Sequence, residues 1–146
     1  MKAVIQRVSS SSVMVDNEIT GAIDQGLLVL LGIHEDDNKE QMEWICRKIS
    51  KLRIFEDDEG KMNRSVQDVG GGILLVSQFT LYANSDKGTR PSFIEAARPE
   101  KAEPMYEDMI EWFKTHTDIN IQTGEFGAMM SVKLENDGPV TIILEK

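Results

Sequence analysis

The chain begins with short apolar runs separated by polar or turn-forming residues, a pattern typical of β-strands. Residues 4–8 predict a first strand, and the polar run 9–12 predicts a break after it. Residues 13–15 and 19–23 flank an Asp-Asn-Glu turn and predict a hairpin. The apolar run 26–33 contains a glycine at or near each end and is short for a helix, so it predicts a buried central strand.

Two later segments have apolar residues at the spacing of amphipathic α-helices. The first can be capped by residues 36–38 and is expected to run to about residue 52. Its apolar face is formed by Met42, Ile45, Cys46, Ile49 and Leu52. The second is expected over residues 99–116, with Pro104 as an alternative start because proline suits the first turn of a helix. The spacing places Cys46 in the core rather than in a reactive site.

Further strands are expected in the second half of the chain. Residues 73–83 start as a buried run and predict a strand throughout, and residues 119–123, 128–134 and 140–144 predict three more. The order is strands, helix, strands, helix, strands, and most connections look too short for parallel crossovers. We expect one domain over residues 1–146 with an α+β fold, in which mainly antiparallel β-sheets form a barrel-like core with two packed α-helices.

Charge and composition restrict the classes of protein to which the chain can belong. Sixteen basic and 25 acidic residues give a net charge of −9, which argues against non-specific binding to nucleic acid. Two local clusters of cations remain, at residues 47–53 and at Lys87 with Arg90, and a solvated surface would account for either. The chain has a single cysteine, no run of 18 apolar residues and no signal-peptide block, so we expect a cytoplasmic protein without membrane contact.

An unusual polar segment follows the buried run 73–76. Residues 77–83 read Ser-Gln-Phe-Thr-Leu-Tyr-Ala, and strand alternation would place the odd-numbered side chains on one face and the even-numbered ones on the other. Uncharged hydrogen-bonding groups at a strand end suit a small polar ligand. A strand that simply leaves the core would show the same pattern.

A second unusual segment is the Gly138-Pro139 step within residues 136–141. An ordinary hairpin is better served by Asn-Gly or Asp-Gly without a following proline, because proline cannot donate to the ladder. Gly138 supplies backbone freedom and Pro139 fixes φ. We therefore expect a rigid tip, poor in side chains, that presents its backbone to a neighbouring group.

Conventional catalytic sets are hard to assemble from this sequence. The only histidines, His34 and His116, are expected at the surface or at a helix end. There is no G-x-S-x-G elbow and no Cys/His cluster with zinc spacing, so no metal and no cofactor are expected. If the protein is an enzyme, its chemistry needs little from side chains.

Taken together, residues 77–83 and 136–141 resemble the two signature motifs of the D-aminoacyl-tRNA deacylases. The likeness extends over essentially the whole chain and includes residues 1–8, 87–93 and 124–130. The resemblance implies hydrolysis of the ester that joins a D-amino acid to the 3′-terminal adenosine of tRNA, with rejection of L-aminoacyl groups as chiral proofreading. It also implies a homodimer in which the Gly-Pro step is cis and acts in trans, in the partner's site.

The same resemblance suggests roles for single residues. Ser77, Gln78, Phe79 and Thr80 form the catalytic segment, in which backbone N–H groups around Phe79 and Thr80 are expected to stabilise the oxyanion. The carbonyl groups of the Gly138-Pro139 step are expected to accept hydrogen bonds from the substrate's α-ammonium group. An L side chain would then meet a rigid wall, whereas glycyl-tRNA would not be rejected.

Contacts with the RNA are expected from two further pairs of residues. Phe126 and Met129, beside Phe79, are candidates for an apolar slot for the terminal adenine, although each also suits the core. For phosphate contacts the candidates are Lys87 and Arg90 or, alternatively, the stripe of Arg47, Lys48 and Lys51. Two other interpretations of the sequence stay open: a non-catalytic module that binds an aminoacyl or nucleotide group, and a hydrolase of small esters that uses Ser77 or Thr80 as its nucleophile.

Overall fold

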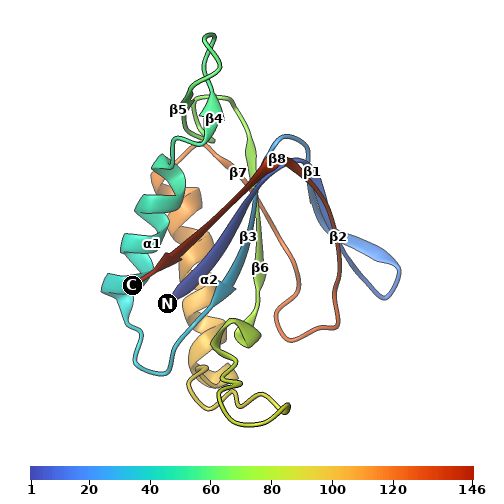
Figure 1. Cartoon of the computed structure of the whole chain (residues 1–146), viewed down its shortest axis with the longest axis vertical. Coiled ribbons are helices and arrows are strands. Elements are labelled where there is room, and N and C mark those ends of the chain that lie inside the picture. The colour runs from blue at the N-terminus through green and yellow to red at the C-terminus, as the bar shows by residue number, and fades with distance from the viewer.

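A computed structural model describes all residues of the chain, from Met1 to Lys146 (Figure 1). It contains two α-helices, a short 3₁₀ helix and two β-sheets. The elements follow in the order β1 (Lys2–Val15), β2 (Glu18–Ile23), β3 (Gly26–Gly32), α1 (Lys39–Lys51), β4 (Phe55–Glu56), β5 (Met62–Arg64), β6 (Gly72–Ser77), η1 (Phe79–Tyr82), α2 (Pro99–His116), β7 (Asn120–Thr123) and β8 (Ser131–Glu145). Neither helix is long and apolar enough to cross a membrane.

The large sheet has the strand order β2-β1-β3-β6-β7, with β8 paired to β1. β1 is antiparallel to β2, β3 and β8, and β4 and β5 form a separate antiparallel pair. The end strands β2 and β7 approach each other where Gly21 faces the carbonyl of Thr123, too closely for a side chain at position 21. The sheet therefore nearly closes into a barrel, and the predicted α+β class is confirmed.

Two connections in this sheet differ from the sequence-based expectation. β6 pairs in parallel with both β3 and β7. The connections looked too short for parallel crossovers, but α1 lies between β3 and β6 along the chain and α2 lies between β6 and β7. Each helix is therefore the crossover that a parallel pair requires. The pairings remain mainly antiparallel, with a parallel block at β3-β6-β7.

The main core lies between the sheet and the two helices, which run side by side (Figure 1). α1 begins after Asn38, whose side chain accepts a hydrogen bond from the backbone of Glu40, and the predicted cap is confirmed. Cys46 is fully buried as predicted, and burial raises the pKa of its thiol from an ordinary 9.0 to about 12. α2 begins at Pro99, with Pro104 inside the helix rather than at its start.

Three predicted strand boundaries are wrong. Residues 9–12 do not break the first strand, because β1 continues through them and Ser11 donates its hydroxyl to the carbonyl of Lys133 in β8. The strand expected over residues 73–83 ends at Ser77 and is followed by η1. The runs 128–134 and 140–144 were expected on either side of a tip, but both contribute to the single strand β8.

Candidate functional site

The first signature segment lies where β6 ends and the chain turns. The backbone N–H of Gln78 still donates to Leu31 of β3 at 2.7 Å, which continues the ladder one residue beyond the strand. The chain then tightens into η1, in which the N–H of Leu81 donates to the carbonyl of Gln78 at 3.2 Å. The strand alternation expected for residues 77–83 is therefore absent, and Phe79 and Thr80 lie at an exposed helix start.

This helix start exposes backbone donors and an aromatic ring. The first N–H groups of a helix have no intrahelical acceptor, and no side chain caps η1. Phe79 is 56% exposed, and its ring meets the ring of Phe93 edge to face with 5.2 Å between centroids. The side-chain amide of Gln78 donates to the hydroxyl of Thr80. The segment thus combines unpaired N–H groups with an apolar surface.

The packing of Tyr82, His34 and Lys2 around η1 was not predicted from the sequence. Tyr82, the last residue of η1, is buried, and burial raises the pKa of its hydroxyl above the ordinary 10.0. Its ring lies 5.1 Å from the ring of His34, and the ammonium group of Lys2 lies 4.9 Å from its centroid. His34 accepts a hydrogen bond from the N–H of Asp36 and makes none to Ser77 or Thr80. The histidine is near the segment but is not arranged as a catalytic base.

The residues proposed for adenine and phosphate contacts are only partly brought to this end of the sheet. Phe126 is half-buried and packs 5.9 Å from the ring of Tyr106, whose hydroxyl donates to the backbone of β6. Met129 is 93% exposed. Lys87 and Arg90 are exposed in the loop before Phe93, whose ring touches Phe79.

The second signature segment is a bulge within β8. Gln6 of β1 pairs with Thr141, and Val8 pairs with Asn136, so residues 137–140 have only Arg7 opposite them. The peptide bond between Gly138 and Pro139 is cis, and Gly138 has a φ of 129°, which favours glycine. The prediction of a tip that joins two paired strands is therefore wrong. The segments on both sides of Gly138-Pro139 pair with β1 instead of with each other.

Two side chains hold this bulge in place. Arg7 is only 6% exposed, and its guanidinium donates to the carbonyls of Ile54 at 2.7 Å and of Asp137 at 3.0 Å. A carboxylate oxygen of Asp137 lies 3.3 Å from the same guanidinium. The side chain of Asn136 accepts a hydrogen bond from the N–H of Val140 at 2.9 Å and so closes the bulge. One sign of this role of Arg7 is present in the sequence, namely a charged residue within an otherwise apolar strand.

The two signature segments do not meet within one chain. Arg7 pairs with Leu27 of β3, which pairs with Ile73 of β6, so the bulge is level with Ile73. Gln78 lies beyond the opposite end of β6, and residues 73–78 span roughly 17 Å of strand. Figure 1 shows the same separation between the upper part of β8 and η1. The structure therefore brings Ser77–Thr80 together at one end and leaves Gly138-Pro139 exposed at the other.

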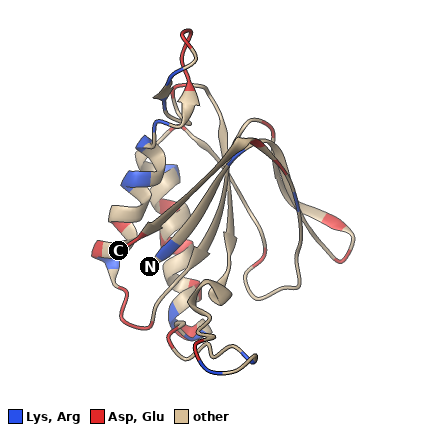
Figure 2. Ribbon diagram, viewed as in Figure 1, with Lys and Arg blue, Asp and Glu red and all other residues tan.

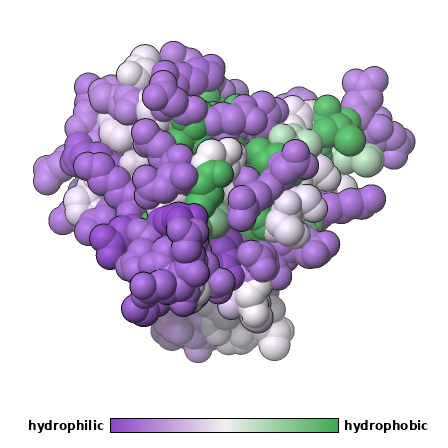
Figure 3. All heavy atoms as spheres, turned by 90° about the horizontal axis from the view of Figure 1, so that it is seen from above, coloured by the Kyte–Doolittle hydropathy of each residue, from purple (hydrophilic) through white to green (hydrophobic).

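Two hollows in the surface are lined by residues outside both signature segments. One hollow of about 440 Å³ lies on α1, and another of about 420 Å³ lies between β1, β2 and β8, and none of Ser77–Thr80 lines either one. Seen from above, the surface is mostly hydrophilic with apolar patches between the polar groups (Figure 3). Leu134 and Ile143, both on β8, are among the large apolar side chains that are exposed.

Comparisons with known proteins agree with the motifs. Residues 4–145 match the family model described as D-Tyr-tRNA(Tyr) deacylase. The chain is 59% identical over 145 residues to a D-aminoacyl-tRNA deacylase of Opitutus terrae, covering 99% of this chain and 97% of the relative. It is 55% identical over 145 residues to a D-aminoacyl-tRNA deacylase of Chloroherpeton thalassium, covering 99% and 95%.

Solved structures show the same fold. A structure titled c-Myc DNA Unwinding Element Binding Protein superposes with a TM-score of 0.95 at 46% identity, covering 100% of this chain and 99% of the other. A probable eukaryotic D-amino acid tRNA deacylase superposes with a TM-score of 0.82 at 16% identity, covering 98% and 97%. The second likeness concerns the fold alone.

Proposed function

The chain belongs to the D-Tyr-tRNA(Tyr) deacylase family and is an ester hydrolase of the D-aminoacyl-tRNA deacylase type, and we propose that it serves as a chiral proofreading enzyme. In this role it releases free D-amino acid and intact tRNA, and it leaves L-aminoacyl-tRNA untouched. We place this activity in the cytoplasm.

The observation that carries the proposal is the separation of the two signature segments. They lie roughly 17 Å apart along the sheet of one chain, too far to touch the same ester group. In a homodimer the two segments can contact the same ester, if the bulge of each subunit lies next to η1 of its partner. Each site then takes Ser77–Thr80 from one subunit and Gly138-Pro139 from the other.

The proposed chemistry relies on backbone donors. Water attacks the ester carbonyl carbon, the bond to the ribose 3′-oxygen breaks, and that oxygen takes a proton as the tRNA leaves. The N–H groups of Phe79 and Thr80 face the developing oxyanion, and loss of one such donor typically costs roughly 10²–10³ in rate. The ribose 2′-OH of the substrate positions the water, because the Thr80 hydroxyl is hydrogen-bonded to Gln78 and has no base beside it.

The proposed selection of handedness relies on a rigid backbone surface. The carbonyls of Gly138 and Pro139 accept hydrogen bonds from the α-ammonium group, and this fixes the α-carbon. An L side chain would then point into the bulge, whereas a D side chain would point into open space. The hydrogen bonds from Arg7 and the closure by Asn136 support this proposal, because only a rigid bulge can exclude an L side chain. Glycyl-tRNA, which has no side chain, is also hydrolysed.

The terminal adenosine is proposed to lie beside the catalytic segment. The exposed ring of Phe79 offers a stacking surface, and Phe126 and Met129 are proposed to line the same slot. Lys87 and Arg90 lie in the loop that reaches Phe79 through Phe93 and are proposed to meet the nearest phosphates.

The test is to follow ester loss from D-Tyr-tRNA, L-Tyr-tRNA and Gly-tRNA in parallel, with molecular mass in solution measured on the same sample. We expect hydrolysis of the D and glycyl esters only, by a dimer. Hydrolysis of the L ester together with generic small esters would favour an ordinary hydrolase with Ser77 or Thr80 as nucleophile. Binding without hydrolysis would favour a non-catalytic module.

A further inference from the structure

The C-terminal half of α1 carries a group of cations that the proposed active site does not use. We call it the α1 patch and define it as the cations Arg47, Lys48 and Lys51 of α1, Arg53 just after the helix, and the neighbouring ring of Trp44, with Lys146 beside Trp44. Figure 2 shows Lys and Arg concentrated on this part of α1. The concentration is notable because the whole chain has a net charge of −9.

Most of this positive charge is not neutralised within the chain. Arg47 pairs with Glu43 at 3.2 Å, but Lys48 and Lys51 form no ion pair. Arg53 bonds to the neutral side-chain amide of Asn63. By contrast, Lys61 and Lys114 are paired with Glu59 and Glu111. The α1 patch is therefore a local field of positive charge on an acidic protein.

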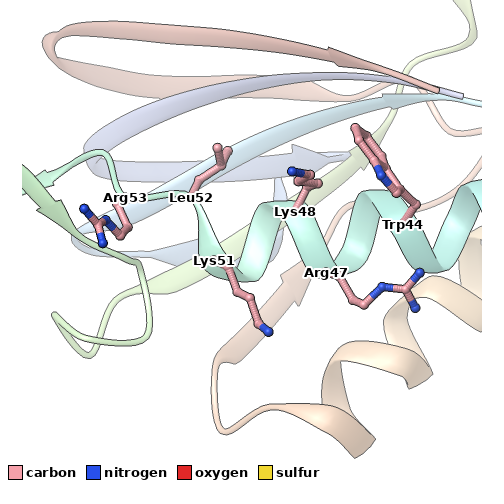
Figure 4. Close-up of a pocket in the computed structure, with 6 residues that line it drawn as sticks. All are labelled: Trp44, Arg47, Lys48, Lys51, Leu52 and Arg53. Atoms are coloured by element: carbon pink, nitrogen blue, oxygen red, sulfur yellow. The ribbon is translucent and has the colours of Figure 1, made fainter.

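The shape of the patch suits an extended polyanion. Trp44 and Lys48 point to one side of α1 and Arg47 and Lys51 to the other, and together with Arg53 they line a hollow of about 440 Å³ (Figure 4). The ammonium group of Lys48 lies 5.4 Å from the centroid of the Trp44 ring, and that of Lys146 lies 5.8 Å from it. An aromatic ring next to cations is a common surface for an RNA backbone and an unpaired base.

The position of the patch ties it to the proposed active site. Arg53 directly precedes Ile54, whose carbonyl accepts the hydrogen bond from Arg7 that holds the bulge. The Arg53 end of the patch therefore lies near the bulge. In the proposed dimer, whose bulge enters the partner's site, we expect this end of the patch to face the RNA that leads away from the partner's ester.

We propose that the α1 patch is a second contact surface for tRNA, which binds its sugar-phosphate backbone beyond the terminal adenosine. This inference rests on the proposed function, because that function supplies the substrate. The patch supplies affinity for the RNA and takes no part in the reaction of the ester. It therefore affects substrates that contain the tRNA body and leaves shorter ones unaffected.

The test compares the double variant K48A/K51A with K61A/K114A, which loses the same two charges elsewhere on the surface. Removal of the patch lysines is expected to weaken binding of uncharged tRNA about tenfold near 0.1 M salt and to lower the slope of log affinity against log salt by about 1.5. The KM for D-Tyr-tRNA rises similarly, kcat is unchanged, and the KM for D-Tyr-adenosine is unchanged. The control behaves as the unmodified protein.

Three outcomes would overturn the inference. One is unchanged tRNA binding and salt dependence in K48A/K51A, and another is an equal loss in both variants, which would indicate net charge rather than a surface. The third is loss of binding to anionic phospholipid vesicles with tRNA binding intact, which would assign the patch to a membrane. Failure of the unmodified protein to hydrolyse D-Tyr-tRNA would reject the proposed function, and the binding of uncharged tRNA would still decide the role of the patch.

Discussion

The start of η1 and the bulge of β8 present backbone groups to solvent in two different ways. η1 keeps its shape through hydrogen bonds of its own backbone and that of β3, and the buried ring of Tyr82 lies beneath it. The bulge has no such ladder across residues 137–140 and is held by the side chains of Arg7 and Asn136. One surface depends on backbone pairing and the other on two polar side chains.

This difference indicates which mutations can affect catalysis and which can affect the discrimination between D and L substrates. A side chain removed near η1 leaves the backbone donors where they are, so the rate should change little. A side chain removed beneath the bulge releases the backbone itself, so the proposed discrimination between D and L substrates should suffer. Each prediction below is a way to break or sharpen that contrast.

The largest effect is expected from Arg7→Ala. The variant loses two hydrogen bonds from a buried charged group and frees the bulge, so we expect a loss of about 3 kcal/mol in the free energy of unfolding. Hydrolysis of L-Tyr-tRNA should rise relative to that of D-Tyr-tRNA. The measurements are denaturant unfolding and the ratio of the two kcat/KM values.

Arg7→Lys is the matched variant, because it keeps the charge but lacks the fork that reaches the carbonyls of both Ile54 and Asp137. We expect it to be intermediate in stability and still impaired in selectivity. If Arg7→Ala folded with the selectivity of the unmodified protein, the bulge would not be the selective element.

A smaller effect is expected from Thr80→Ala. The backbone N–H of residue 80 is kept, and only the hydroxyl that accepts from Gln78 is lost, so kcat for D-Tyr-tRNA should fall less than about tenfold. Single-turnover hydrolysis measures this, with Thr80→Ser as the variant that restores the hydroxyl. Complete loss of activity in a folded Thr80→Ala protein, rescued by serine, would make Thr80 the nucleophile.

The smallest effect is expected from Tyr82→Phe, which tests the support beneath η1. The pKa of Tyr82 is raised by burial, with smaller contributions from Asp37, Glu145 and Glu95, so the unfolded chain ionises this hydroxyl first as the pH rises. Burial of the neutral hydroxyl costs no ionisation energy below about pH 10, and the folded protein becomes progressively less stable as the pH rises above that value and the unfolded chain ionises. The unmodified protein should therefore lose stability faster than Tyr82→Phe above pH 10, and the two should nearly coincide at pH 7.

Unfolding curves of both proteins at pH 7 and between pH 10 and 11 give the comparison. The difference between them is the relevant quantity, because Cys46 and Tyr106 also have raised pKa values and affect both proteins equally. Parallel loss of stability in both would show that Tyr82 ionises no later in the folded protein than in the unfolded chain.

The parts of the fold that the sequence predicts well are those that depend on local signals. The cap at Asn38, the apolar face around Cys46 and the helix that begins at Pro99 can all be identified from neighbouring residues. The run that forms β3 is similarly recognisable because it is apolar throughout and starts at a glycine. The order of strands and helices also indicates the fold class.

The parts that could not be predicted depend on pairing between distant residues. The sequence predicts a break at Ser11, because it does not show that β8 lies beside this residue and that the carbonyl of Lys133 accepts a hydrogen bond from its hydroxyl. The turn after Ser77 brings η1 against Gly32 at the end of β3, and no local turn signal marks it. The place of Gly138-Pro139 depends on Arg7, which lies more than a hundred positions earlier. Within the candidate site, the two motifs were recognisable, but their separation was not.

The pairing of β8 with β1 on both sides of the bulge has a consequence for how this segment can change in evolution. Each half of β8 is aligned independently, by Gln6 with Thr141 on one side and by Val8 with Asn136 on the other. An insertion within either half would turn its following side chains to the opposite face of the sheet. An insertion within residues 137–140 would leave both alignments intact, so the scaffold itself permits bulges of other lengths. The length of this bulge is therefore restricted not by strand alignment but by the hydrogen bonds of Arg7 and Asn136 and by the molecule that the bulge touches.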